Sequence, residues 1–276
     1  MKYTGERFIP QNKAQSIMSL EHYHRYIYAS QYCTNKRVLD IACGSGYGSS
    51  LLSEVAKSVV GVDIDENAIQ WCKQSYNKKN LMFEVNSIDA INYPEKSFDI
   101  ITCFETIEHV SSDQQKKAIE LFGKILEDDG LFFCSTPSTT SPLHIEDNKY
   151  HVHELSEDEF YTLLSSHFKY VRIIGQSVCL CSTIGDFKDS NGSVHTTNKC
   201  RTGDCKYLIG ICSNSDITYI KTSSVYIETS SNILRKLTKI RNKLGWAIPI
   251  YNIGIQMLSK ICPFKKFKQR IENLKW

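Results

Sequence analysis

Three glycines at alternate positions, Gly44, Gly46 and Gly48, stand between a short apolar run and a segment that favours a helix. Residues without side chains let a ligand lie against the backbone, and the first turn of a following helix offers free N–H groups. An acid, Asp63, ends the next apolar run, where a carboxylate can accept hydrogen bonds from both hydroxyl groups of a ribose. We therefore expect a nucleoside site, with helix capping as the alternative role of Asp63.

The residues around the glycines narrow the choice of ligand. A phosphate-binding loop needs Gly-Lys-Ser/Thr, but the run continues as Tyr47, Gly48, Ser49 and Ser50 without a lysine. The dinucleotide pattern G-x-G-x-x-G also fails, because Ser49 stands where the third glycine is needed. Asp40 precedes the glycines, and its charge favours a ligand with a cationic amino group and repels a pyrophosphate. S-adenosylmethionine is such a ligand.

Histidines that could act as a general base follow later in the chain. His109 comes a few residues after the fourth predicted strand, at the edge where open α/β sheets bind their ligands. A second group is dense in imidazole and carboxylate side chains: His144, Glu146, Asp147, His151, His153 and Glu154. This group could contact an acceptor, bind a divalent metal or form a polar surface, and His109 could cap a helix instead. We take His109 first and His153 second as candidate bases, and we assign no metal ligand.

The segments that must position these residues alternate between strand and helix from residue 36 onward. This alternation predicts an α/β fold with a mostly parallel seven-stranded sheet and helices on both faces. The predicted strands are residues 37–42, 59–63, 81–86, 98–104, 131–136, 171–175 and 207–212. Helices are predicted at 16–32, 48–56, 66–76, 113–126 and 157–167, the last after a capping box of Ser156 and Glu159. Gly130 is expected to end the fourth of these helices.

Four motifs resemble, in this order, those of class I S-adenosylmethionine-dependent methyltransferases: VLDIACGSGYG, VVGVDID, FEVNSIDAINYPEKSFDIITCFETIEHV and GLFFCSTP. The resemblance covers residues 36–136 and implies a Rossmann-like fold that binds S-adenosylmethionine. The flanking motifs GERFIP, EHYHRY and YHVHELSEDEF are similar to those of methyltransferases encoded in bacterial surface-polysaccharide clusters. They imply O-methylation of a sugar in a surface glycan or its precursor, with a lipid or a quinone as the alternative acceptor.

The resemblance also implies roles for matching residues near the first strand. Asp40, Ala42, Gly44 and Gly46 would hold the methionine part of the cofactor. Many family members have glycine at the position of Ala42, and alanine still permits a close approach to the backbone. Four residues of the first helix are candidates for closing over the cofactor, with a solvated polar face as the alternative: Glu21, His22, Arg25 and Tyr26.

Five further residues match positions that contact the rest of the cofactor. Asp63 would bind the ribose, with Ile64 beside the adenine. Asp89 would accept a hydrogen bond from the adenine amino group, and Ile88 would pack on the ring. Glu105 would face the amino acid end of the cofactor or the acceptor. Asp89 and Glu105 could alternatively be solvated loop acids.

Charge is unevenly distributed along the 276 residues. Residues 232–276 carry 11 Lys and Arg against one acid, a net charge of +10, whereas the rest carries 22 bases and 29 acids, a net charge of −7. The acidic body argues against a nucleic acid partner. The tail has apolar residues at helical spacing, with lysines on another flank. It predicts an amphipathic helix that contacts an anionic membrane, packs on its own domain or joins a homodimer.

We expect a lid segment (1–35), a methyltransferase domain (36–215) and a basic C-terminal extension (216–276). The start of the sequence shows no secretory signal, which predicts a reducing, cytoplasmic location, and the tail adds contact with the inner membrane face as a hypothesis. Cys33, Cys43, Cys72, Cys103 and Cys134 are expected to pack as free thiols. Five later cysteines lack paired zinc spacing: Cys179, Cys181, Cys200, Cys205 and Cys212. The rival class is a non-catalytic domain of this fold, which the intact glycines and acids disfavour.

Overall fold

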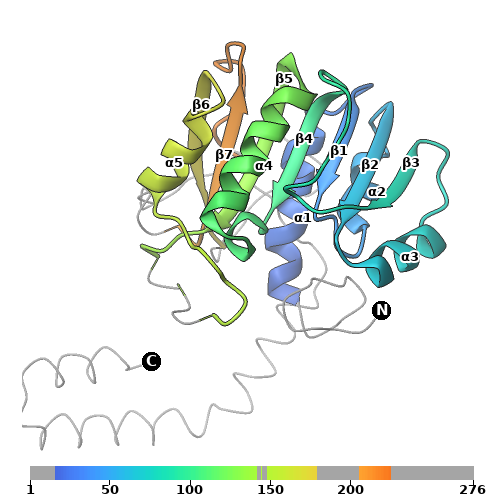
Figure 1. Cartoon of the computed structure of the whole chain (residues 1–276), viewed down its shortest axis with the longest axis horizontal. Coiled ribbons are helices and arrows are strands. Elements are labelled where there is room, and N and C mark those ends of the chain that lie inside the picture. Colours follow the sequence, from blue (N-terminus) through green and yellow to red (C-terminus); the bar gives the residue numbers. More distant parts are fainter. Residues whose placement is uncertain (1–15, 142–143, 145–147, 179–204, 225–276) are drawn as a thin grey trace, which may run out of the picture. The chain divides into compact units, whose positions relative to one another are not determined.

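Seven strands form one sheet in the order β3-β2-β1-β4-β5-β7-β6 (Figure 1). The computed structural model describes residues 16–141, 144, 148–178 and 205–224. The strands are β1 (Arg37–Ile41), β2 (Ser58–Asp63), β3 (Leu81–Val85), β4 (Phe98–Phe104), β5 (Leu126–Pro137), β6 (Tyr170–Gln176) and β7 (Tyr207–Ser213). β1 to β5 pair in parallel, whereas β7 lies antiparallel between β5 and β6. The predicted α/β fold with a mostly parallel sheet of seven strands is confirmed.

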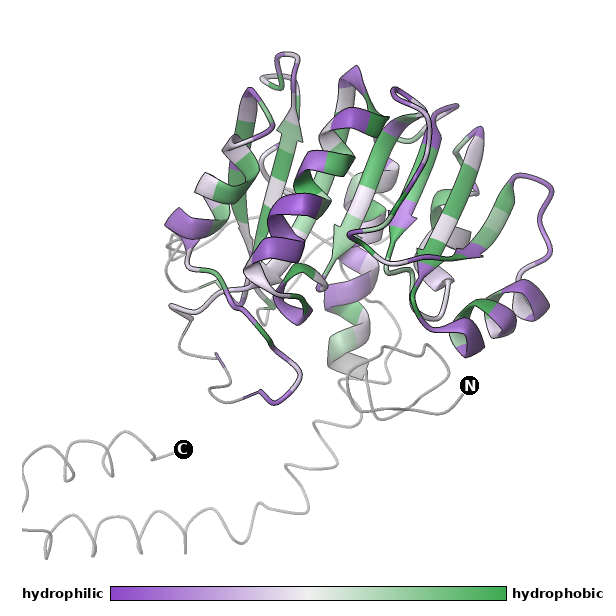
Figure 2. Ribbon diagram, viewed as in Figure 1, coloured by the Kyte–Doolittle hydropathy of each residue, from purple (hydrophilic) through white to green (hydrophobic). Residues whose placement is uncertain are grey.

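Helices cover both faces of this sheet. They are α1 (Ser16–Ser30), α2 (Tyr47–Leu52), α3 (Glu66–Ser75), the 3-10 turn η2 (Ile107–His109), α4 (Ser112–Ile125) and α5 (Glu157–Ser165). One buried cluster packs α4 and α5 on the sheet, and a second packs α1, α2 and α3 on the other face. Figure 2 shows apolar residues along the central strands and hydrophilic residues on the outer face of α4.

Caps fix where three helices begin. The predicted capping box of Ser156 and Glu159 starts α5, and a second box of Ser111 and Gln114 starts α4. Asp65 caps α3, because its side chain accepts hydrogen bonds from the N–H groups of Asn67 and Ala68. Capping of α3 therefore belongs to Asp65, which excludes the alternative role considered for Asp63.

The prediction that Gly130 ends a helix is wrong. α4 ends at Ile125, and β5 begins at Leu126 and contains Gly130. A side chain at Gly130 would place its Cβ 2.8 Å from the carbonyl oxygen of Asp99, so close packing against the neighbouring strand requires glycine. The predicted helix over 48–56 is also shorter, since α2 ends at Leu52.

Residues after β7 pack on the domain as far as the structure describes them. Ile217 and Ile220 are buried, and the backbone N–H of Lys221 donates to the hydroxyl of Tyr32 at 3.0 Å. The basic tail 232–276 and the cysteines at 179, 181 and 200 lie outside the described residues. The described cysteines are buried, and the five expected to pack as free thiols do so: Cys33, Cys43, Cys72, Cys103 and Cys134. Within the described ranges, no helix is long and apolar enough to cross a membrane.

Candidate active site

The glycine turn follows β1 at the carboxyl edge of the sheet. Ala42, Gly44 and Gly46 all have positive φ, at 53°, 56° and 71°. This left-handed backbone costs an alanine roughly 1 to 2 kcal/mol, which explains why glycine suits the position of Ala42. Ala42 and Gly44 are half-buried, whereas Gly46 is buried. The part of the turn that a ligand can reach is therefore its first half.

The later glycines make room for protein side chains. A Cβ at Gly48 would lie 2.0 Å from the ring of Tyr26, and one at Gly46 would lie 2.8 Å from Sγ of Cys72. These two positions are glycine because α1 and α3 pack closely against the turn. The expectation that a ligand fills the space at all three glycines is corrected accordingly.

Asp63 ties the turn to the end of β2. Its Oδ2 accepts from the N–H of Gly44 at 2.8 Å, and its Oδ1 accepts from the N–H of Asp65 at 2.9 Å. A carboxylate has about four acceptor positions, so these two bonds are compatible with further donors such as ribose hydroxyls. Ile64 follows with a side chain that is 71% exposed, which suits a residue that packs on a flat ligand. Both residues lie at the end of β2, as the sequence predicted, and their contacts with a cofactor stay predictions.

Asp40 is not on the surface of the site. Its carboxylate is fully buried and accepts hydrogen bonds from Ser49 Oγ at 2.6 Å, Thr102 Oγ1 at 2.8 Å and the Tyr26 hydroxyl at 3.0 Å. Burial raises the pKa of Asp40 to about 6, although the three hydroxyl groups oppose this shift. In this structure Asp40 holds α1, α2 and β4 together, and it does not face a ligand.

The loop after β3 holds the two residues expected near the adenine. Ile88 is buried in the core cluster under α4, with 8% of its surface exposed. Asp89 is half-buried and accepts hydrogen bonds from Ser87 Oγ and from Nε2 of Gln114, the latter at 3.3 Å. The bond from Ser87 lowers the pKa of Asp89, so this acid stays charged and able to accept a further hydrogen bond.

Glu105 directly follows β4 and has a left-handed conformation with φ 53°. Ser135 Oγ donates to its Oε1 at 2.7 Å, and NH1 of Arg25 lies 3.8 Å from the same oxygen. Arg25 is 1% exposed, and its NH1 donates to Oε1 of Gln176 at 2.7 Å. Its Nε and NH2 have no hydrogen-bond partner among the described residues. Arg25 thus brings a buried cation with two free donors to the site.

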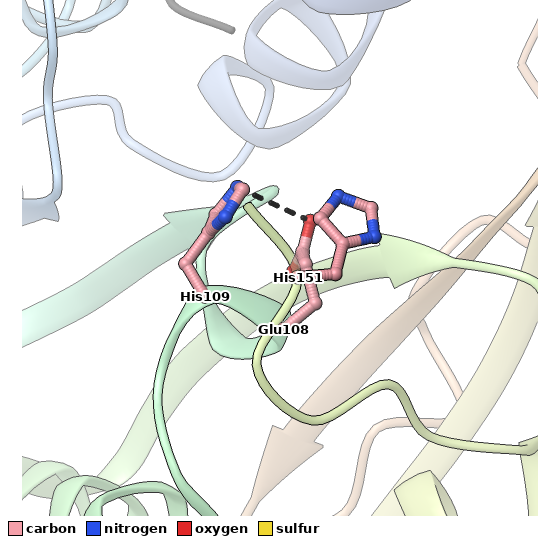
Figure 3. Close-up of side chains that lie close together, drawn as sticks. All are labelled: Glu108, His109 and His151. Carbon is pink, nitrogen blue, oxygen red and sulfur yellow. Dashed lines mark ion pairs between the residues drawn. The ribbon is translucent and has the colours of Figure 1, made fainter. Parts of the chain in front are cut away.

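Three side chains that could bind a metal or a substrate meet beyond β4. Glu108, His109 and His151 each offer a ligand atom within 4.8 Å of the others (Figure 3). The carbonyl oxygen of Glu108 accepts from the N–H groups of Val152 at 2.8 Å and His153 at 3.1 Å, which holds this loop against η2. The two segments are some forty residues apart in the chain, so spacing could not reveal their contact.

The other residues of the predicted polar group are distributed around this cluster. Glu154 contacts Nδ1 of His151 and lies 3.1 Å from Nε2 of His144. His153 turns to α4, where its Nδ1 lies 3.1 Å from Oε1 of Gln115. Glu146 and Asp147 lie outside the described residues. Sequence reasoning missed Glu108, for which the signal was an acid directly before His109, a few residues after a buried strand.

The strand order and the antiparallel β7 define a class I methyltransferase fold. The glycine turn joined to Asp63 lies at the sheet edge where the sequence predicts the S-adenosylmethionine site. Residues 17–168 match the family described as methyltransferase domain, and the chain belongs to this family. The expected membership in a methyltransferase family is thereby confirmed.

Relatives and solved structures agree with this assignment. A probable S-adenosylmethionine-dependent methyltransferase of Mycobacterium tuberculosis is 33% identical over 164 residues, which are 58% of this chain and 58% of that protein. A ubiquinone biosynthesis O-methyltransferase of Coxiella burnetii is 32% identical over 114 residues, 41% of this chain and 48% of that protein. The chain therefore spans about half the length of these relatives. The YcgJ protein of Bacillus subtilis shares the fold, with a TM-score of 0.52 at 20% identity over 71% of this chain and 100% of that chain.

Proposed function

We propose that the chain transfers the methyl group of S-adenosylmethionine to a hydroxyl group of a polar small molecule, a sugar of a surface glycan or of its precursor. The observation that carries this proposal is the arrangement of two groups at one sheet edge. The glycine turn follows β1 and is joined to Asp63 at the end of β2. The cluster of Glu108, His109 and His151 lies beyond the end of β4, which is the neighbour of β1 in the sheet. A donor site beside a polar acceptor site is what transfer between two bound molecules requires.

The described residues fit the cofactor at both of its ends. Asp63 has acceptor capacity for the ribose, and the exposed Ile64 beside it offers an apolar contact for adenine. At the other end, Nε and NH2 of Arg25 are adjacent donors of one guanidinium edge, a geometry that suits a carboxylate. A buried guanidinium with two unused donors is costly, so an anionic ligand group would stabilise it. Because Arg25 is 1% exposed, the side chains that cover it have to move aside for the carboxylate to reach these donors.

S-adenosylmethionine, when bound, supplies a methyl group that its sulfonium already activates. The task of the chain is then to exclude water, orient the acceptor and remove a proton from its hydroxyl group. Nδ1 of His109 lies 2.9 Å from the carbonyl oxygen of Tyr150, so Nδ1 carries the hydrogen and Nε2 is available as a base. We keep His109 as the first candidate base and His153, held by Gln115, as the second.

A second acceptor class is a hydroxylated aromatic ring, such as a quinone precursor. The Coxiella burnetii relative is named for ubiquinone biosynthesis. Val152 is 64% exposed and Tyr150 is 39% exposed, and both flank the histidines, so an apolar ring would find contacts there. The family resemblance of the flanking motifs favours the sugar. We also propose a cytoplasmic location with peripheral membrane contact through residues 232–276, or a homodimer through the same tail.

Calorimetry with S-adenosylhomocysteine tests the cofactor half of the proposal on the full chain. Asp63→Ala should weaken binding by about 1.5 to 3 kcal/mol, the range for hydrogen bonds to a charged group. Asp65→Ala is the matched control, because it removes the α3 cap and costs about 1 kcal/mol of stability but leaves the ribose acceptor. Undiminished affinity in Asp63→Ala would contradict the ribose assignment.

The role of Arg25 has its own pair of probes. Arg25→Gln should weaken S-adenosylhomocysteine at least tenfold and leave 5′-methylthioadenosine, which lacks the carboxylate, unchanged. Equal losses for both nucleosides would mean that Arg25 acts on the fold and not on the carboxylate.

A radiolabelled methyl-transfer screen of nucleotide sugars and dihydroxybenzoates tests the acceptor half. With the acceptor found, His109→Gln should keep cofactor affinity while turnover drops at least tenfold. If His109→Gln and His153→Gln both turn over like the wild type, neither histidine is the base.

A further inference from the structure

The cluster of Glu108, His109 and His151 has the composition of a metal site. Two imidazoles and one carboxylate are donors that Zn²⁺, Fe²⁺ and Co²⁺ prefer, whereas Mg²⁺ prefers oxygen donors. All three ligand atoms lie within 4.8 Å of one another. Bonds of about 2.0 to 2.2 Å to one ion need donors somewhat closer than this, so small side-chain movements would complete the site.

Each of the three side chains is held from outside the cluster. Glu108 Oε2 accepts from Thr136 Oγ1 at 3.3 Å, while Oε1 lies 4.0 Å from Nε2 of His109. Nδ1 of His109 donates to the carbonyl oxygen of Tyr150. Nδ1 of His151 contacts the carboxylate of Glu154. Outer partners of this kind, a carbonyl or a carboxylate on the second ring nitrogen, fix the tautomer of histidines that ligate metals.

The charge and burial of the cluster suit a dication. The Glu108 carboxylate is 1% exposed and accepts a hydrogen bond from the neutral hydroxyl group of Thr136. A buried carboxylate is costly unless a positive charge compensates it, and a bound cation would supply that charge. Nε2 of His151 lies 3.0 Å from Nδ2 of Asn148, so an ion at this nitrogen requires the Asn148 side chain to turn away.

We propose that Glu108, His109 and His151 bind a divalent transition-metal ion whose open positions take two neighbouring hydroxyl groups of the methyl acceptor. The site lies on η2 and the loop held against it, beside the end of β4 (Figure 3). The ion would occupy Nε2 of His109 and so replace this histidine as the group that activates the acceptor. It would orient the acceptor and make the bound hydroxyl group more acidic, and the proton would leave to solvent. The acceptor part of this proposal rests on the proposed function, whereas the metal part does not.

Cobalt is the probe for the metal part, because its visible absorption reports the ligands. Full-length protein freed of metal with EDTA should bind one equivalent of Co²⁺ and develop absorption bands that Zn²⁺ removes. Glu108→Gln and His151→Gln should each weaken Co²⁺ at least tenfold. His153→Gln, on the same loop but directed to Gln115, should bind Co²⁺ like the wild type.

Calorimetry with S-adenosylhomocysteine on the same variants separates this proposal from the cofactor assignment, and we expect unchanged nucleoside affinity. UDP-galactose and 3,4-dihydroxybenzoate are then added separately to the Co²⁺ protein, and one of them should change the absorption spectrum. The compound that does so shows whether the acceptor is a sugar or an aromatic diol. Absence of stoichiometric Co²⁺ binding, or equal affinity in all three variants, would overturn the metal site and leave the histidines as bases. Spectra that neither diol changes would overturn its role in acceptor binding.

Discussion

Asp40 should make the stability of the protein fall as the pH rises, and Asp40→Asn should remove this dependence. Burial raises the pKa of Asp40 to about 6 in the folded chain, against about 3.9 for an aspartate in an unfolded one. Two pKa units correspond to about 3 kcal/mol, at 1.36 kcal/mol for each unit. Because the folded state binds this proton more tightly, the contribution is complete below about pH 4 and is lost as the pH rises through about 6.

Urea unfolding followed by circular dichroism, at several pH values between 4.5 and 7.5 and without cofactor, measures this effect. Other groups titrate alike in both proteins, so the difference in unfolding free energy isolates Asp40. Relative to the wild type, Asp40→Asn should gain about 2 to 3 kcal/mol across this range. Any constant cost of placing an amide among the three hydroxyl groups shifts the whole curve and leaves its slope unchanged.

A second variant tests the cause of the shift. Thr102 Oγ1 donates to the Asp40 carboxylate at 2.8 Å, and this bond lowers the pKa of Asp40. Thr102→Val should therefore raise that pKa further and extend the loss of stability to higher pH. A difference between wild type and Asp40→Asn that does not vary with pH would refute the argument from burial. A difference that changes in the wild type's favour with rising pH would mean that the three hydroxyl groups outweigh desolvation.

Three further predictions concern the glycine turn and the tail. Ala42→Gly should raise the free energy of unfolding, measured in urea, by about 0.5 to 1 kcal/mol. Glycine adopts φ 53° without strain, and this gain exceeds the backbone entropy that glycine loses on folding. A lower free energy of unfolding would mean that the Ala42 methyl group packs favourably. Gly48→Ala should cost about 1 to 3 kcal/mol in the same assay because its Cβ would meet the ring of Tyr26, whereas Gly123→Ala on α4, with 3.6 Å to His167, should be neutral or stabilising. If both alanines behave alike, the contact of α1 with the turn is not tight. The full chain should cosediment with anionic vesicles at low salt, because its basic tail is attracted to the lipid head groups, and a chain ending at Ser231 should not. High salt should release the full chain, since salt screens this attraction. Equal sedimentation of the two chains at low salt would remove the membrane hypothesis.

The sequence by itself determined the features that depend on short stretches of chain. Alternating strand and helix patterns gave the seven strands, because the periodicity of burial is local and each element spans only a few residues. The glycine turn and Asp63 were also predicted from sequence, since two consecutive parallel strands bring their carboxyl ends to one edge of the sheet. The order of the last strands in the sheet was not predicted. β7 lies between β5 and β6, and the residues of a strand do not by themselves indicate which strands it pairs with.

Only the tertiary structure decided which polar groups meet. Asp40 looked like a ligand contact from its place before the glycines, but Tyr26 and Thr102 cover it from α1 and β4. Arg25 NH1 donates to Gln176 at a separation of 151 residues, while its Nε and NH2 have no hydrogen-bond partner among the described residues. The cluster of Glu108, His109 and His151 likewise joins η2 to a loop forty residues later. Such contacts depend on how whole elements pack, and packing brings together residues whose distance along the chain carries no information about their distance in space.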